Sequence, residues 1–167
     1  GYLYPMSILK GRKSRCTFTG ITFAGTGQNL DTGCKVVLAA PETTAAIETK
    51  SISKGGGVST FRSSVVATPA AENSVASVSC QSLMLDDHSR SDTIPAMDIR
   101  CKHVDVGHEA TIGRIGDDKV FYLMSRGIPE EEARTMIVNG FADPVSKELP
   151  LEYAVEMNNL IKLEMEG

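Results

Sequence analysis

The sequence predicts a mainly β protein with a helical C-terminal part, and three observations support that fold class. Seven short runs rich in apolar and β-branched residues fill residues 1–116, with turn signals between them. Ser and Thr supply 24 of the first 110 residues but only 3 of the last 51. Residues 1–116 hold 12 basic and 10 acidic side chains, whereas residues 117–167 hold 5 and 11. We therefore expect two domains, 1–116 and 117–167.

The strand-like runs of the first part do not by themselves decide the β architecture. Alternation with period two is clearest in Thr17–Phe23, and the close spacing of the runs suits a sandwich, a barrel or a β-solenoid. Small Ala, Ser, Thr and Val residues dominate and Trp is absent, which favours the narrow stacked coils of a parallel β-helix. The predicted strands are Cys16–Phe23, Lys35–Ala40, Ala45–Lys50, Val58–Thr68, Val75–Leu85, Thr93–Arg100 and His103–Ile115.

The acidic second part predicts three helices. Lys119–Arg126 forms the first, since two aspartates precede it and Gly127 is a suitable C-terminal cap. The second begins at Pro129 with three glutamates in its first turn, and we expect Pro144 to stop it. The third covers roughly Ser146–Met165. The expected apolar stripes are Ala133, Met136, Ile137, Gly140 and Phe141, then Leu149, Tyr153, Met157, Leu160 and Ile161.

Composition excludes several protein classes. No stretch approaches the roughly 20 apolar residues of a membrane helix, and a net charge of −4 argues against nucleic-acid binding. The N-terminus lacks the basic and apolar regions of a signal peptide, so we expect a cytoplasmic protein with free thiols. The four cysteines form no C-x-x-C pair, which argues against a zinc ribbon or a thioredoxin motif.

Two polar stretches suggest binding sites at first sight. Ser53–Thr60 contains three consecutive glycines, but a phosphate-binding P-loop carries its lysine after the glycines and leads into a helix. We therefore interpret this stretch as a tight turn with positive-φ glycines. The second stretch contains the polar residues Asp86, Asp87, His88 and Asp92. It lacks the ligand spacing of a calcium loop, so we favour a solvated turn.

Five further residues carry metal-binding or nucleophilic side chains. Cys101, His103 and Asp105 alternate, so an extended strand would place them on one face. They are zinc or iron ligands by type, but three residues of one strand rarely enclose a tetrahedral ion, so a metal site there is the less favoured reading. Cys80 and His108 lie in two other strand-like runs. Such a pair could activate a thiolate or bind a soft metal, while core packing is the plainer interpretation of Cys80.

Motifs spread over nearly the whole chain then point to one family. They are Asp31–Gly33, Ser51–Gly57, Ser89–Pro95, Gly107–Thr111, Phe121–Gly127, Glu130–Ala133, Ile137–Phe141, Leu149–Ala154 and Leu163–Gly167. In these segments the sequence resembles the C-terminal part of SufB in the SufB/SufD family, the scaffold proteins of the SUF iron–sulfur cluster assembly system. The resemblance implies a right-handed parallel β-helix followed by a small C-terminal helical domain. It also implies that the chain is a segment of a longer protein.

The resemblance also assigns site residues. Cys80 matches the cysteine that receives sulfur and is proposed as a cluster ligand, and thiolates suit both tasks. His108 and Glu109 match a His-Glu pair proposed beside the nascent cluster. The implied cofactor is a transient iron–sulfur cluster in the intact complex, with no metal site beyond it. The other three cysteines match no functional position of the family.

Partners follow from the same resemblance. The SufC ATPase is expected on the helices of residues 119–141, SufD or a second copy on the β-helix, and a sulfur-transfer protein as donor. The chain has no nucleotide motif, so we expect a scaffold rather than an enzyme. An open upstream edge of the β-helix predicts dimerisation. The alternatives are a thiol-dependent enzyme using Cys80 and His108, a module that only docks SufC, and a carbohydrate-active β-helix, which 5 Phe and 4 Tyr make a poor fit.

Overall fold

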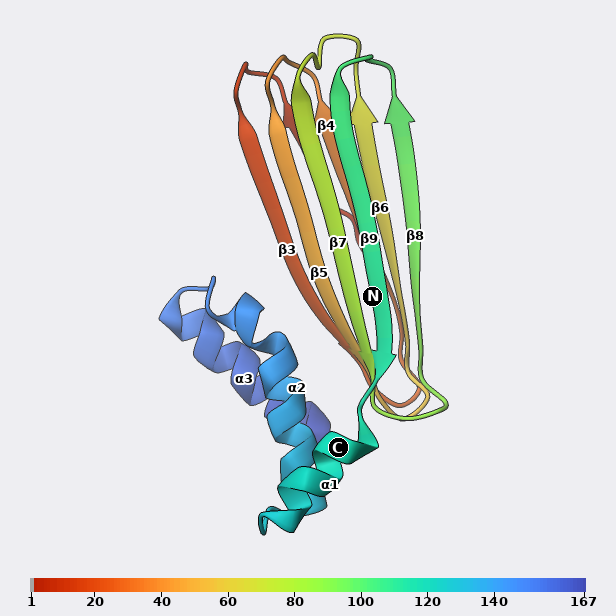
Figure 1. Ribbon diagram of the computed structural model, residues 1–167, viewed down its shortest axis with the longest axis vertical. Coiled ribbons are helices and arrows are strands. Elements are labelled where there is room, and N and C mark those ends of the chain that lie inside the picture. The colour runs from red at the N-terminus through yellow and green to blue at the C-terminus, as the bar shows by residue number, and fades with distance from the viewer. Residues whose placement is uncertain (1) are drawn as a thin grey trace.

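The computed structural model describes residues 2–167 as a parallel β-helix followed by three helices (Figure 1). This confirms the predicted architecture. All strand pairings are parallel in the part of the chain that is described. The strands are β1 (Tyr2–Leu3), β2 (Met6–Leu9), β3 (Arg15–Ala24), β4 (Asn29–Leu38), β5 (Thr44–Ser53), β6 (Val58–Ala67), β7 (Ser74–Met84), β8 (Arg90–Ile99) and β9 (Val104–Arg114).

Successive strands from β3 onward alternate between two sheets. The first sheet has the order β1-β4-β6-β8, with β2 also paired to β4, and the second sheet has the order β3-β5-β7-β9. One coil takes about 30 residues, since Thr49 pairs with Cys80 and Cys80 pairs with Ala110. Residues one coil apart therefore stack in rows across each sheet, and alternate residues along each strand face the interior.

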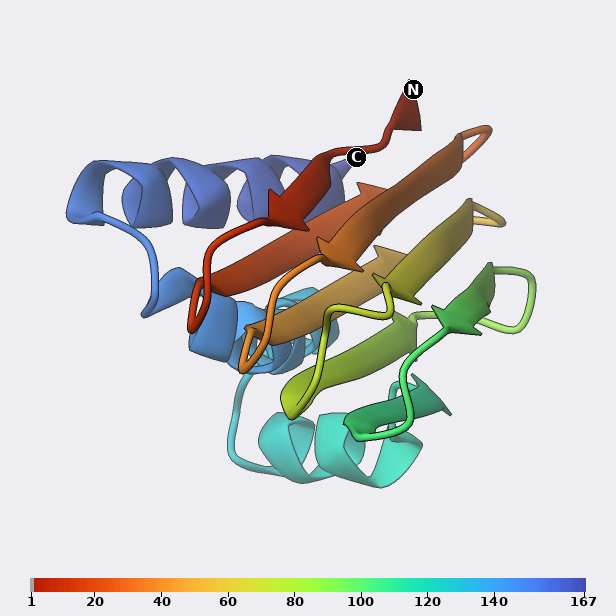
Figure 2. The same cartoon turned by 90° about the horizontal axis from the view of Figure 1, so that it is seen from above.

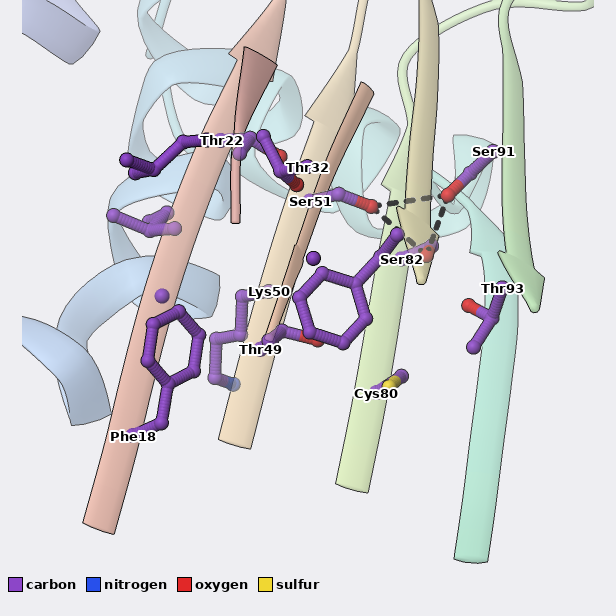
Figure 3. Close-up of a pocket in the computed structure, with 15 residues that line it drawn as sticks. Phe18, Thr22, Thr32, Thr49, Lys50, Ser51, Cys80, Ser82, Ser91 and Thr93 are labelled. Carbon is purple, nitrogen blue, oxygen red and sulfur yellow. Dashed lines mark hydrogen bonds between the residues drawn. The ribbon is translucent and has the colours of Figure 1, made fainter. Parts of the chain in front are cut away.

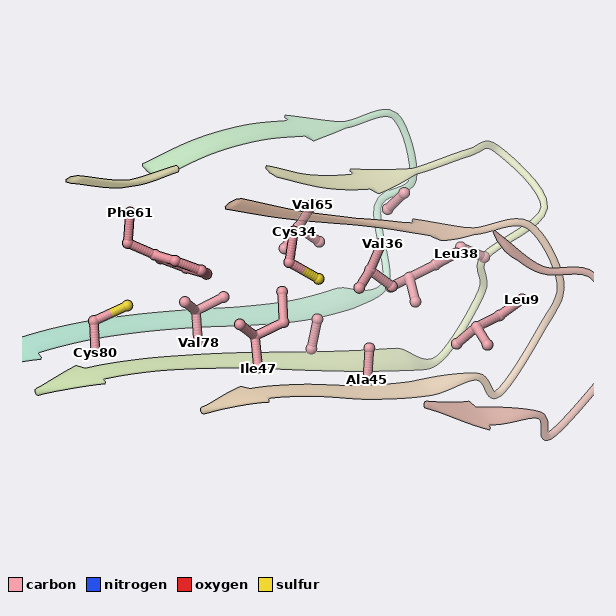
Figure 4. Packing of buried hydrophobic residues seen from close by; sticks show 13 residues of the cluster. Leu9, Cys34, Val36, Leu38, Ala45, Ile47, Phe61, Val65, Val78 and Cys80 are labelled. Carbon is pink, nitrogen blue, oxygen red and sulfur yellow. The ribbon is translucent and has the colours of Figure 1, made fainter. Parts of the chain in front are cut away.

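The interior between the sheets is narrow and is filled by small and branched side chains (Figure 4). Ile47 and Val78 stack in one row of the second sheet, and Val36 and Val65 stack in one row of the first. No more than 2% of each of these four side chains is exposed. The burial of β-branched and small residues explains why a sequence rich in Val, Ala, Ser and Thr forms this coil.

The Gly-rich stretch after β5 is a tight turn, as predicted. Gly55 and Gly56 have φ values of 64° and 84°, in the region that side chains with a Cβ rarely adopt. Gly57 has an ordinary φ, but a Cβ there would collide with the backbone carbonyl oxygens of Ala24 and Gly25. The glycines therefore serve the close stacking of successive turns.

The three helices pack on the outer face of the second sheet (Figure 2). They are α1 (Asp117–Ser125), α2 (Glu130–Ser146) and α3 (Leu151–Glu166). Their shared core contains Ile52 from β5 and Leu85 from the turn after β7, together with Ile115, Val120, Ala133, Val138, Ala142 and Ile161. The division into two domains stays a prediction. None of the helices within residues 2–167 is both long and apolar enough to cross a membrane.

Two helix boundaries differ from those predicted. Pro144 lies inside α2 rather than stopping it, because a proline near the end of a helix loses one backbone hydrogen bond and the helix runs on only to Ser146. The third helix begins at Leu151 instead of Ser146. Pro150 explains the later start, since the residue before a proline is disfavoured in helical conformation and Pro150 itself is extended at ψ 149°.

Two lysines, Lys50 on β5 and Lys54 just after it, connect the helices to the β-helix. Lys50 on β5 places its Nζ 4.6 Å from the centre of the Phe141 ring on α2 and donates a hydrogen bond of 2.7 Å to Gln81. Lys54, just after β5, donates to the backbone oxygens of Met165 and Gly167 at 2.8 and 2.9 Å. A cation suits the negative end of a helix dipole, so Lys54 caps α3.

Candidate functional site

The Cys80 thiol lies inside the β-helix, on the inner face of β7. Its side chain is 3% exposed. Burial raises the pKa of the Cys80 thiol, while hydrogen bonds from the Thr49 and Thr93 hydroxyls act in the opposite direction. Thr49 is the direct register partner of Cys80, and Thr93 reaches across from β8 of the first sheet. The thiol therefore has a threonine neighbour on each sheet.

A cavity of about 80 Å³ opens beside Cys80 (Figure 3). Seven of its fifteen lining residues carry hydroxyl groups, and three of these form a closed hydrogen-bonded ring. Ser51 and Ser82 lie 2.9 Å apart, Ser91 and Ser82 lie 2.7 Å apart, and Ser51 and Ser91 lie 3.0 Å apart. The remaining hydroxyls belong to Thr22, Thr32, Thr49 and Thr93. The lining therefore combines hydroxyl groups with the apolar side chains of Leu3, Phe18 and Phe61, and carries little charge.

His108 also faces the interior. It pairs with Val78 on β7, so it is a diagonal neighbour of Cys80 on the inner face of the second sheet, with Cα atoms about 8 Å apart by standard strand spacing. Its Nε2 atom is buried and, in the part of the chain that the structure describes, has no hydrogen-bond partner. A buried nitrogen without a partner is costly, so this atom is available to a ligand or to a group from outside.

Glu109 faces the opposite way from His108, because neighbouring residues of a strand point to opposite faces. It is exposed on the outer face of β9 and accepts a hydrogen bond of 3.4 Å from the Ser79 hydroxyl. The structure therefore brings Cys80 and His108 to one face and places Glu109 on the other. Within residues 2–167, no three His, Cys, Asp or Glu side chains are arranged to hold a metal ion.

The alternating Cys101, His103 and Asp105 do not share a strand. Strand β9 begins at Val104, so the first two lie in the turn before it and only Asp105 is extended. The expectation of one strand face was wrong here, because the chain bends between coils at these positions. The His103 Nδ1 atom lies 2.8 Å from the Oε2 atom of Glu72, and His103 and Cys101 together hold the pKa of the Glu72 carboxyl below its usual range. This is a hydrogen-bonded surface turn.

The Asp86 loop is a hydrogen-bonded turn, as the sequence favoured. The Asp86 carboxylate accepts backbone hydrogen bonds from Gly55, His88 and Ser89 at 2.6, 3.0 and 2.8 Å. Asp87 pairs with Arg114, and Asp92 pairs with Arg90. The carboxylates of this loop are therefore occupied by protein donors, and Asp86 ties the Gly-rich turn to the turn one coil further on.

The helices expected to dock a partner expose large apolar side chains. On α1, Phe121 is 72% exposed, and Tyr122 and Met124 are also exposed. On α2, Met136 is exposed, whereas Ala133 is fully buried. The predicted apolar stripe of α2 is therefore split between packing on the β-helix and facing solvent. Exposed aromatic and methionine side chains on adjacent helices are typical of a protein-binding surface.

Sequence reasoning missed the hydroxyl groups around Cys80. Thr49 and Thr93 lie 31 residues before and 13 residues after it. The available signal was the alternation along β5, where inward positions change from Ala45 and Ile47 to Thr49 and Ser51. This pattern identifies a site only when the strand register is known, because the register places β5, β7 and β8 around one cavity.

Comparison with known proteins places this site in a family context. The family described as "SUF system FeS cluster assembly, SufBD core domain" matches residues 2–141. The iron–sulfur cluster assembly protein SufB of Bacillus subtilis is 49% identical over 164 residues, which cover 98% of this chain and 35% of that protein. A SufBD family protein of Mycobacterium tuberculosis is 45% identical, with coverages of 98% and 19%. The chain thus spans about a third or less of these relatives.

Proposed function

The chain belongs to the SufBD family of the SUF iron–sulfur cluster assembly system, and we propose that it carries the sulfur-accepting site of an assembly scaffold. In this proposal, persulfide sulfur arrives at Cys80, iron joins it, and the assembled cluster passes to an apo-protein. The cluster is cargo rather than a resident cofactor. Two observations support the proposal. The buried Cys80 thiol lies beside a cavity with several hydroxyl groups, and His108, on the same inner face, has a buried imidazole nitrogen without a hydrogen-bond partner among the described residues.

Cys80 and His108 supply the two kinds of donor that a transient cluster needs. A thiolate bonds iron strongly and accepts sulfane sulfur, and an imidazole nitrogen is a weaker iron ligand. Clusters usually take about four protein ligands, so we expect the remaining donors to come from another chain. Glu109, also proposed from the resemblance, would act from the outer face of β9. Because β9 is an edge strand of the second sheet, it is a suitable place for SufD to meet the site.

The partner ATPase is assigned to the helical surface. We propose that SufC docks on residues 119–141, where Phe121, Tyr122 and Met136 are exposed. ATP hydrolysis belongs to that partner in the proposal, and the chain acts in the cytoplasm. Lys50 joins α2 to β5, the strand that carries Thr49, so this surface is mechanically connected to the Cys80 site. The proposed homodimer would form through the upstream edge and would give twice the monomer mass in light scattering.

Persulfide mapping tests the proposal. The full-length protein is incubated anaerobically with a cysteine desulfurase, a sulfur-transfer protein and SufC, and peptide mass spectrometry locates the added sulfur. We expect persulfide on the Cys80 peptide and its loss in Cys80→Ser. Cys34→Ser is the matched control, since that thiol is also buried in the interior, with 4% exposure. Sulfur on other peptides, with Cys80→Ser fully active, would contradict the proposal and leave a module that only docks SufC.

The thiol-enzyme alternative makes a different prediction. It requires a Cys80 that alkylates quickly near neutral pH without any partner, as a low-pKa catalytic thiol does. The burial of Cys80 acts against that behaviour. Fast alkylation of the isolated protein, together with turnover of a thiol-dependent substrate, would favour the enzyme over the scaffold.

A further inference from the structure

Two threonines lie beside the Cys80 thiol, one on each sheet. Thr49 on β5 is the direct register partner of Cys80, whereas Thr93 belongs to β8 of the opposite sheet. Both line the cavity beside the thiol, and both act to lower the pKa of the Cys80 thiol, against the larger effect of burial. Neutral hydroxyl groups therefore approach the sulfur from two directions.

The neighbours of Thr49 fix the direction of its hydroxyl. Gly20 on β3 lies beside Thr49 in the same row, and a Cβ built on Gly20 would stand 3.7 Å from the Thr49 methyl group. The same Cβ would stand 3.1 Å from the Phe18 ring. The Thr49 methyl group thus points towards Gly20 on β3. The Thr49 hydroxyl therefore faces the other neighbouring strand, β7, where Cys80 lies. A β-branched side chain has few rotamers, so this orientation is well defined.

No cation competes with these hydroxyls among the described residues that line the cavity. Lys50 is the one charged residue in that lining, and its Nζ atom is engaged by Gln81 and by the Phe141 ring. Hydrogen bonds to a charged acceptor are stronger than those between neutral groups. The two threonine hydroxyls are therefore the groups placed to stabilise negative charge on this sulfur.

We propose that Thr49 and Thr93 are positioning residues for sulfur transfer to Cys80, an inference that rests on the proposed role of Cys80 as sulfur acceptor. They hold the sulfur facing the cavity and then donate hydrogen bonds to the outer sulfur that it acquires. The Cys80 thiolate attacks the outer sulfur of a donor persulfide, R–S–SH, and the donor S–S bond breaks. Cys80–S–SH forms and R–S⁻ leaves, so one sulfane sulfur moves with its proton and no oxidant or reductant is consumed.

The cavity has room for the product. An S–S bond extends the side chain by about 2 Å, and the space beside Cys80 is lined by the hydroxyls of Ser82 and Ser91. The outer sulfur would therefore lie among hydroxyl donors rather than against the apolar end of the interior.

The test measures Cys80 persulfide in the full-length protein, with the same donor system as above. Two quantities are recorded by peptide mass spectrometry: the initial rate of loading, and the half-life of the loaded persulfide in dithiothreitol. Thr49→Val and Thr93→Val keep the side-chain shape and remove one hydroxyl each. We expect each to slow loading about tenfold and to shorten the half-life. Thr49→Ser and Thr93→Ser restore the hydroxyl and should restore both quantities.

Thr32→Val is the matched control, because Thr32 lines the same cavity and lies two strands from Thr93 in the same row. It should load sulfur at the wild-type rate. Valine variants that load at the wild-type rate, or serine variants that stay slow, would overturn the proposal. A wild-type protein that gains no sulfur on Cys80 would overturn the proposed function instead. Thr93 is only half-buried, so Thr93→Val tests the proposal independently if Thr49→Val does not fold.

Discussion

The interior of the β-helix has two ends with different chemistry. At the end far from the helices, inward positions are apolar, as with Ile47 and Val78 in the second sheet and Val65 in the first (Figure 4). At the end near the helices, the same strands present Ser51, Ser82 and other hydroxyls (Figure 3). Cys80 stands at the boundary between them.

The difference shows how one repeated coil serves two purposes. The apolar end is filled by contacts between side chains, which stabilise the fold through burial. The hydroxyl end satisfies its polar groups in the Ser51–Ser82–Ser91 ring and keeps an open cavity. Since both ends use the same strands, function is added by changing alternate side chains without changing the backbone.

The largest expected effect comes from the apolar end. Ile47→Ala removes a side chain that is 1% exposed and leaves a void in the narrow interior. We expect the free energy of unfolding to fall by about 2–5 kcal/mol, because the coil cannot collapse around the lost volume. Urea unfolding followed by circular dichroism measures this. A loss well under 1 kcal/mol would mean that the apolar end is not the stabilising half.

The hydroxyl end should tolerate a comparable change better. Ser82→Ala removes one of the three hydroxyl groups of the serine ring. The Ser51 and Ser91 hydroxyls remain 3.0 Å apart and still hydrogen-bond to each other. We expect a loss of about 1 kcal/mol in the free energy of unfolding, measured as for Ile47→Ala. If Ser82→Ala destabilised the protein as much as Ile47→Ala does, the two ends would not differ in the way proposed.

The fold was predictable from residue types that recur once per coil. The alternation in Thr17–Phe23, the absence of Trp and the Gly-rich turn all report local geometry, and that geometry is what a solenoid repeats. The end of α2 was not predictable from Pro144 alone. A proline excludes only its own backbone hydrogen bond, and packing of Val145 against the β-helix continues the helix past it.

The site was predictable only in part. Cys80 and His108 were assigned from the family resemblance, and the structure places them on one inner face. The separation of His108 from Glu109 follows from strand alternation and was available in the sequence. The hydroxyls of Thr49 and Thr93 were not, because three strands distant in sequence meet only after the register between coils is known.

The smallest expected effect on the free energy of unfolding comes from Asp86, and it depends on pH. Burial opposes ionisation of Asp86, but hydrogen bonds from Ser89, Gly55 and His88 outweigh it and hold the pKa of this carboxyl below its usual range. A lowered pKa stabilises the fold above the unfolded-state pKa of about 4, and that contribution is lost as pH falls through the folded-state pKa. Asp86→Asn should therefore cost about 1 kcal/mol or less at pH 7, since the group is partly solvated.

The pH dependence is the sharper measurement. Unfolding of the wild type and of Asp86→Asn is compared at several pH values between 7 and about 3, and their difference should shrink towards zero at the acid end. Ile47→Ala is the control, because its cost comes from packing and should stay constant over the same range. A difference for Asp86→Asn that does not change with pH would mean that the carboxylate charge contributes nothing to holding the Gly-rich turn, and that shape alone joins the coils there.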